Sequence, residues 1–78
     1  MNPDETASEM FNIWVDNTEL NLFGELCVND ATLREMAELF GNLKEDQRYD
    51  CFIKFISILE EEGYEYDRNQ FHYETSIN

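Results

Sequence analysis

Carboxylate side chains are the groups in this sequence whose types and spacing point to chemistry. Asp46 and Asp50 are four residues apart and Glu35 and Glu38 are three apart, so each pair would share one face of a helix. Carboxylates one helical turn apart are separated by about 6 Å, the scale on which arginines that bind phosphates are arranged. Because Arg and Lys bind carboxylates and phosphates with similar geometry, these residues are candidates for contacting a basic partner.

A second group of acids lies toward the end of the chain. Glu60, Glu61 and Glu62 end a predicted helix, where the backbone dipole is negative and each such charge costs about 0.3–1 kcal/mol. Residues that oppose a local preference are candidates for function, although Glu is also a good helix former that could simply solvate this end. The predicted partner-binding set is Glu35, Glu38, Asp46, Asp50, Glu60, Glu61, Glu62, Glu65 and Asp67.

The net charge restricts the classes of partner. The chain has 18 Asp and Glu against 5 Lys and Arg in 78 residues, for a net charge of −13. A globule of this length is about 30 Å across, and duplex DNA of that length carries about 18 negative charges. We therefore expect no direct binding to nucleic acid, but occupation of a protein site that is built for nucleic acid. The alternative is that the charge only keeps a small domain in solution.

Other chemistries find little support in the residue types. The single histidine, His72, has no cysteine at zinc spacing, so we predict no metal site and interpret it as a strand residue at a sheet edge. Cys27 and Cys51 have apolar neighbours instead of the cation or base that activates a thiol. The glycines are isolated and form no phosphate-binding loop, so we expect no enzyme and no cofactor.

The same composition bears on localisation. Two thiols predicted to be buried and free, and an acidic N-terminal stretch unlike a signal peptide, favour the cytoplasm, or the host cytoplasm if the protein is viral. There is no long apolar run, so no membrane contact is expected.

Two helices are predicted to position the acids. The segment 42–63 carries polar residues at helical spacing, with Asn42 and Glu45 as its start signal and Gly63 as its stop. The segment 29–41 begins with an Asn-Asp pair and also ends in glycine. Because almost no linker separates the two, we expect a tight antiparallel helix pair.

The remaining segments favour strands. Alternating apolar and polar residues predict a hairpin over 10–28, although two short helices fit part of the same pattern and would give an all-α bundle. The segments 64–66 and 71–73 suggest one or two further strands, joined by a turn at 67–70. Residues 1–8 are expected to form a flexible acidic lead.

The predicted fold is therefore α+β, with a small antiparallel sheet and a two-helix hairpin packed on one of its faces. We expect a single globular domain over residues 9–78.

The size, the charge and the lack of catalytic groups resemble the small acidic inhibitors that phages use against host defence. These include antirestriction proteins, anti-CRISPR proteins and uracil-DNA glycosylase inhibitors, many of which mimic DNA. Leu22-Phe23-Gly24 on a predicted strand, followed by a helix with acidic outer positions, looks like the repeating unit of one antirestriction DNA-mimic family. The resemblance implies competitive occupation of the basic nucleic-acid groove of a CRISPR effector or a restriction enzyme.

Two further expectations concern the contacts with a partner. Trp14, Tyr64 and Tyr66 are candidate aromatic anchors at the centre of an interface. The apolar circumference of segment 42–63 is wider than one small sheet covers. This favours an alternative function, a regulatory or protein-interaction module that forms a homodimer or docks through its apolar helix pair.

Overall fold

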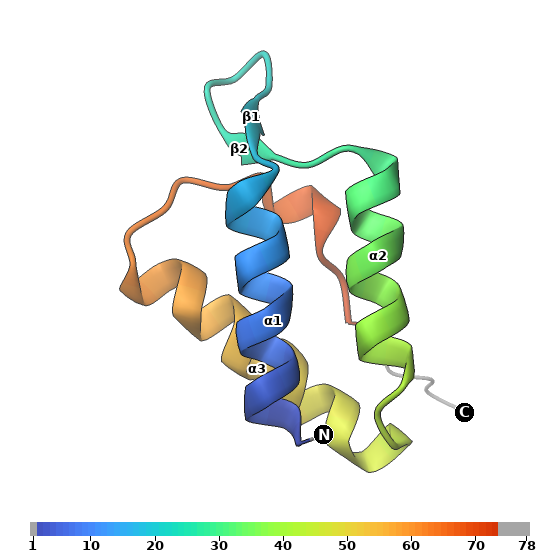
Figure 1. Ribbon diagram of the computed structural model, residues 1–78. Coiled ribbons are helices and arrows are strands. Elements are labelled where there is room, and N and C mark those ends of the chain that lie inside the picture. Colours follow the sequence, from blue (N-terminus) through green and yellow to red (C-terminus); the bar gives the residue numbers. More distant parts are fainter. Residues whose placement is uncertain (1, 74–78) are drawn as a thin grey trace, which may run out of the picture.

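The computed structural model describes residues 2–73 and shows three helices with a small hairpin at one end (Figure 1). In chain order the elements are α1 (Pro3–Asp16), β1 (Glu19–Leu20), β2 (Leu26–Cys27), α2 (Asp30–Gly41), α3 (Glu45–Glu61) and a short 3₁₀ helix, η1 (Arg68–Gln70). The expected α+β class is confirmed, because the helices are accompanied by a two-stranded antiparallel sheet.

Helix α1 begins much earlier than the sequence pattern suggested. The side chain of Asn2 accepts a hydrogen bond from the Glu5 amide at 2.8 Å, and Pro3 occupies the first turn, where its missing amide proton costs nothing. Residues 3–8, which we expected to be a lead outside the domain, form the first half of this helix. Thr6 and Ala7 are fully buried there, so the segment belongs to the core.

The strand predicted for the first part of 10–28 is wrong, because these residues continue α1. Ala7, Met10 and Trp14 are buried at helical spacing. Helix α1 packs mainly against α3 and also against α2. A helix that contacts two neighbours buries a wide face, so Ile13 and Val15 are half-buried beside that central row. Because the buried face is wide, apolar and polar residues alternate along this part of the sequence as they would in a strand.

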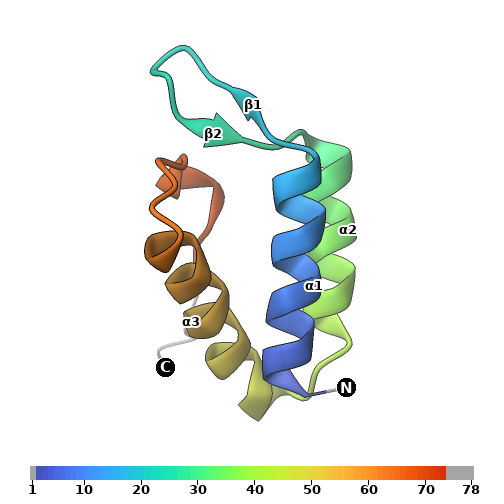
Figure 2. The same cartoon turned by 60° about the vertical axis from the view of Figure 1, so that its left-hand side comes forward.

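The antiparallel hairpin is real but shorter than expected. Glu19 pairs with Cys27 and Leu20 with Leu26, and the loop between them turns through Gly24 at a φ of +76°. The hairpin lies beyond the ends of the helices and does not carry them on one of its faces (Figure 2).

Helix α2 starts as predicted, with the Asn29 side chain accepting from the Thr32 amide at 2.8 Å. The predicted start of the next helix at Asn42 is wrong, because Asn42 caps the C-terminus of α2 and α3 begins at Glu45 after Lys44.

The predicted stop at Gly63 is confirmed by its φ of +76°. Amide to carbonyl bonds from Gly63 to Glu60 and from Tyr64 to Leu59 complete the Schellman motif that glycine allows at a helix end.

The expected tight pair of α2 and α3 is not the main packing unit. Helices α1 and α2 run antiparallel and side by side in both views, whereas α2 and α3 make the fewest contacts of the three helix pairs. The hairpin connects α1 to α2 and so fixes this pair. The central helix is α1, and its Trp14 packs in a core with Phe55 and Leu59 of α3.

Segment 64–73 forms a turn instead of the predicted strands. A single bridge joins Tyr66 to Leu26, and η1 follows with the Asp67 side chain accepting from the Asn69 amide at 3.0 Å, as the predicted turn required. The Gln70 side chain then takes the place of a strand, since it accepts from the Val28 amide at 3.0 Å and donates to the Val28 carbonyl at 2.8 Å. Residues 74–78 of the predicted domain lie outside the described residues.

Candidate partner-binding surface

Almost every carboxylate in residues 2–73 is exposed. The exceptions are Glu25 and Asp67, which are half-buried. The predicted site residues that are exposed are Glu35, Glu38, Asp46, Asp50, Glu60, Glu61, Glu62 and Glu65. The surface is therefore acidic over all three helices.

The structure brings five of the predicted site residues together at one end of α3. We call this group the acidic segment, and it consists of Glu60, Glu61, Glu62, Glu65 and Asp67. Backbone hydrogen bonds join it to the hairpin, from the Leu26 amide to the Glu65 carbonyl at 2.8 Å and from the Asp67 amide to the Leu26 carbonyl at 2.9 Å. The acidic segment and the hairpin are thus held as one unit.

The other predicted acids lie elsewhere. Glu35 and Glu38 are on α2, and Asp46 lies in the first turn of α3, where a negative charge is favourable. Along α3, exposed Ile53 and Lys54 separate Asp46 and Asp50 from the acidic segment. Asp46 and Glu61 are about 22 Å apart along the helix axis at 1.5 Å per residue, so α3 has no continuous acidic edge.

Sequence reasoning missed the acids of α1. Glu5, Glu9 and Asp16 are all exposed, and with Asn12 they follow the spacing of four, three and four residues that marks one helix face. The signal was present in the sequence but was hidden by the strand interpretation of residues 10–16.

Most of the rings expected to be aromatic anchors are buried. Trp14 is completely buried, Tyr66 is 6% exposed, and Tyr64 is half-buried with its ring centroid 5.4 Å from that of Trp14. Trp14 and Tyr66 belong to the core and are not available to a partner, whereas Tyr64 packs against the core and is partly exposed.

Large apolar side chains are instead exposed on the hairpin. We call this group the hairpin tip, and its members are Leu20 at 69% exposure, Leu22 at 100% and Phe23 at 86%. The three lie within four residues of each other. The Leu22-Phe23-Gly24 tripeptide that carried the family resemblance is therefore a solvent-exposed loop and not part of a strand.

A polar cleft lies between the hairpin and the acidic segment. It has a volume of about 200 Å³ and is lined by Glu25, Tyr64, Glu65, Tyr66 and Arg68. The Arg68 guanidinium lies 5.6 Å from the centroid of the Tyr66 ring, within the range of a cation–π contact.

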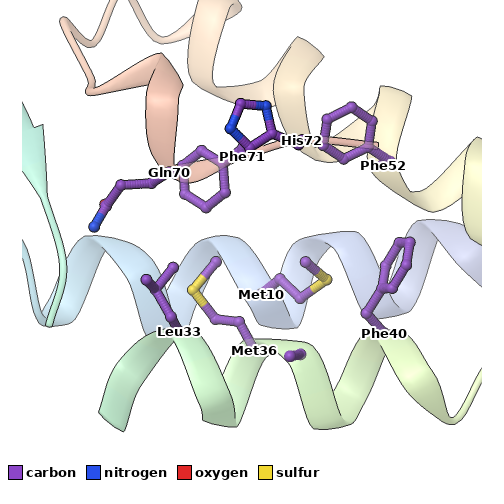
Figure 3. A pocket seen from close by; sticks show the side chains of 9 residues that line it. Met10, Leu33, Met36, Phe40, Phe52, Gln70, Phe71 and His72 are labelled. Carbon is purple, nitrogen blue, oxygen red and sulfur yellow. The ribbon is translucent and has the colours of Figure 1, made fainter. Parts of the chain in front are cut away.

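A larger, apolar pocket opens between α1, α2, α3 and the segment that begins at the end of η1 (Figure 3). Its volume is about 280 Å³. It is lined by Met10, Leu33, Met36, Ala37, Phe40, Phe52, Gln70, Phe71 and His72. His72 lies here, exposed and outside the sheet, so its expected place at a sheet edge is wrong. No carboxylate lines this pocket, so the pocket is not part of the acidic surface.

The two thiols are free, and their environments differ. Cys51 is fully buried, and its thiol donates to the Met10 sulfur at 3.7 Å. Burial raises the pKa of Cys51 from 9.0 to about 11, and the Asp4 carboxylate adds to the effect. Cys51 is therefore a protonated thiol at neutral pH, which is the opposite of an activated nucleophile. Cys27 is half-buried, and its thiol donates to the Glu19 carbonyl at 3.5 Å.

Within residues 2–73, no group of three or more His, Cys, Asp or Glu side chains is arranged to hold a metal ion. No helix in the same range combines the length and apolar character needed to span a membrane. Comparisons with protein-family models, curated proteins and solved structures gave no match. The function must therefore be argued from the chain's own residues.

Proposed function

We propose that this protein is an acidic inhibitor that imitates a nucleic acid and occupies the basic groove of a nucleic-acid-binding protein, such as a CRISPR effector or a restriction enzyme. The observation that carries the proposal is that the carboxylates of residues 2–73 are exposed or half-buried, on all three helices and the hairpin. The longest dimension is 35 Å. Duplex DNA of that length carries about 20 negative charges, compared with a net charge of −13 here.

Two of the five basic residues are engaged with the chain itself. Arg48 donates to the carbonyls of Leu43 at 3.3 Å and Gly41 at 3.1 Å, and Arg68 stacks on Tyr66. Both guanidinium groups keep their charge, but 5 basic residues against 18 acids leave the surface predominantly negative. Such a surface would accelerate association with a basic groove and make it strongly dependent on salt.

The experiment is a competition assay with labelled duplex on a panel of purified restriction enzymes and CRISPR effectors. We expect the protein to displace duplex from at least one member of the panel. Excess duplex should abolish binding of the protein by competition, and about 0.5 M salt should abolish it because salt screens the attraction between the charges. Binding that is unchanged under both conditions would contradict a nucleic-acid mimic.

Charge-neutralising variants localise the contact. The triple variant Glu60→Gln, Glu62→Gln, Glu65→Gln removes three charges from the acidic segment. Its matched control, Glu5→Gln, Glu9→Gln, Asp16→Asn, removes three exposed charges from α1. We expect the first variant to inhibit at least about tenfold less well than the control, which corresponds to about 1.4 kcal/mol. Wild-type inhibition by the first variant would exclude the acidic segment as the contact.

The second candidate function is a regulatory module that forms a homodimer through α3. The observation that favours it is the exposure of Tyr49 at 52% and Ile53 at 45%, one helical turn apart on that helix. The remaining apolar residues of α3, such as Phe52 and Ile56, are already half-buried by packing within the chain. Sedimentation velocity tests this function, because a monomer at high concentration and high salt would rule out the homodimer.

A further inference from the structure

The hairpin tip places large apolar side chains in water without any use in the fold. Leu22 is 100% exposed and Phe23 is 86% exposed. Burying either side chain would stabilise the fold, so a small domain that leaves both in solvent forgoes a large part of its available stabilisation. Single exposed apolar residues are common, but neighbouring ones at the end of a projecting element indicate a contact surface.

The tip is held in one conformation by the side chain of Asn21. Its side-chain oxygen, Oδ1, accepts from the backbone amides of Phe23 and Glu25, each at 2.9 Å. The backbone carbonyl of Asn21 accepts from the Gly24 amide at 3.1 Å. The base of the hairpin is anchored to the acidic segment through Leu26. A loop ordered in this way loses little conformational entropy when it docks, which favours binding.

The surrounding charge determines what kind of partner fits. Glu19 and Glu25 flank the tip, and the backbone pairing of Leu26 with Glu65 places the acidic segment next to the hairpin. A second copy of the chain would bring two net charges of −13 together. An anionic membrane would repel the tip in the same way. A protein with basic residues around an apolar socket satisfies both the charge and the exposed side chains.

We propose that Leu22 and Phe23 insert into an apolar socket at the edge of the partner's basic groove, while the acidic segment contacts the groove itself. This inference rests on the proposed function, and it assigns the specificity of binding to the tip and the attraction to the carboxylates. Aromatic anchors surrounded by polar contacts carry most of the energy in many protein interfaces.

The test combines crosslinking with affinity measurements. A photoreactive p-benzoylphenylalanine at position 23 is irradiated in lysate of the cell that contains the protein, and the partner peptide joined to it is sequenced by mass spectrometry. The purified partner is then titrated calorimetrically with the wild type, with Phe23→Ser and with His72→Ser. His72 is the control because it is also an exposed ring side chain, and it lies outside the hairpin and the acidic segment. Both substitutions are at exposed sites, and thermal unfolding verifies that each variant folds.

The expected result is a rise in Kd of about tenfold to a hundredfold for Phe23→Ser, because it anchors the interface, and of less than about twofold for His72→Ser. The crosslinked peptide should contain apolar residues bordered by Lys or Arg. The proposal is overturned if position 23 joins no protein or joins a second copy of the chain. It is also overturned if Phe23→Ser binds like the wild type, or if phosphatidylcholine vesicles bind the wild type and not the variant.

The test separates failure of this inference from failure of the proposed function. If Phe23→Ser binds normally while the triple variant of the acidic segment does not, the tip has no role and the electrostatic inhibitor stands. Phe23→Ser could instead lose binding while the triple variant and about 0.5 M salt have no effect. That result would refute both the proposed contact with a basic groove and the placement of the socket beside it.

Discussion

Amide side chains organise the hairpin end of this molecule, whereas most of the described carboxylates are exposed. Asn21 orders the hairpin tip by accepting two backbone amides, and Gln70 joins Val28 across 42 residues of sequence through two hydrogen bonds. Hydrogen bonds between neutral amide groups need no countercharge. The carboxylates of Glu5, Glu25 and Asp67 accept local hydrogen bonds, and most of the other acids of residues 2–73 are exposed.

The two cysteines provide a prediction at the residue scale. Burial raises the pKa of Cys51 to about 11 from the 9.0 of an exposed thiol. The protonated thiol therefore contributes its full stabilisation below pH 9, and this contribution is lost as the pH rises through 11, because the unfolded thiol ionises first. We expect the free energy of unfolding of the wild type to fall more steeply between about pH 9 and 11 than that of Cys51→Val.

Urea unfolding at a series of pH values measures this effect, and Cys27→Ser is the matched control because it retains the buried thiol. The three proteins differ only at the substituted cysteines, so only the difference between slopes is informative. Identical slopes for the wild type and Cys51→Val would show that the Cys51 pKa is not raised by folding.

At the element scale, α3 carries acids at both of its ends with opposite consequences. Glu45 lies in the first turn, where the helix dipole favours negative charge, and Glu61 lies in the last turn, where it does not. No basic residue occurs in the last turn to offset Glu61. The Schellman motif at Gly63 satisfies the terminal carbonyls, so the helix ends in an orderly way in spite of this charge.

This asymmetry predicts opposite effects for the same substitution. Glu61→Gln should raise the free energy of unfolding by about 0.3–1 kcal/mol, and Glu45→Gln should lower it by a similar amount. Both residues are exposed, so packing does not change in either variant. Denaturant midpoints at low salt measure the difference. A loss of stability in Glu61→Gln would mean that the acidic segment supports the fold and is not maintained at its expense.

At the scale of the whole molecule, self-repulsion is the dominant consequence of the composition. A net charge of −13 within a radius of gyration of 12.4 Å places like charges close together in the folded state. Unfolding separates these charges, and so the repulsion lowers the free energy of unfolding. A basic groove would remove the same repulsion on binding, so that partner binding also stabilises the protein.

The melting temperature should therefore rise as sodium chloride increases from about 10 mM to 150 mM, because the screening length falls from about 30 Å to 8 Å. The triple variant of the acidic segment carries less charge, and its melting temperature should rise less over the same range. Calorimetry or circular dichroism measures both. A melting temperature that does not respond to salt in the wild type would show that repulsion among the acids does not limit stability.

Local signals in the sequence were sufficient wherever one residue controls the backbone. Asn29 predicted the start of α2, Gly63 predicted the end of α3, and the polar residues at 67–70 predicted a turn. Capping and left-handed geometry are decided by the residue itself and its nearest neighbours. The charge of the surface was also determined by composition, because 18 acids cannot be buried in 78 residues.

Only the tertiary structure decided which partners each element has. Residues 10–16 fit either a strand or a helix until α1 is seen between α2 and α3, which bury a wide face of it. The segment 64–73 forms no strand, because the hydrogen bonds of the Gln70 side chain and the single bridge at Tyr66 stand where a ladder of backbone hydrogen bonds would be. The hairpin tip stands beside the acidic segment because Leu26 bonds to Glu65 and Asp67, a contact between distant residues that no local pattern contains.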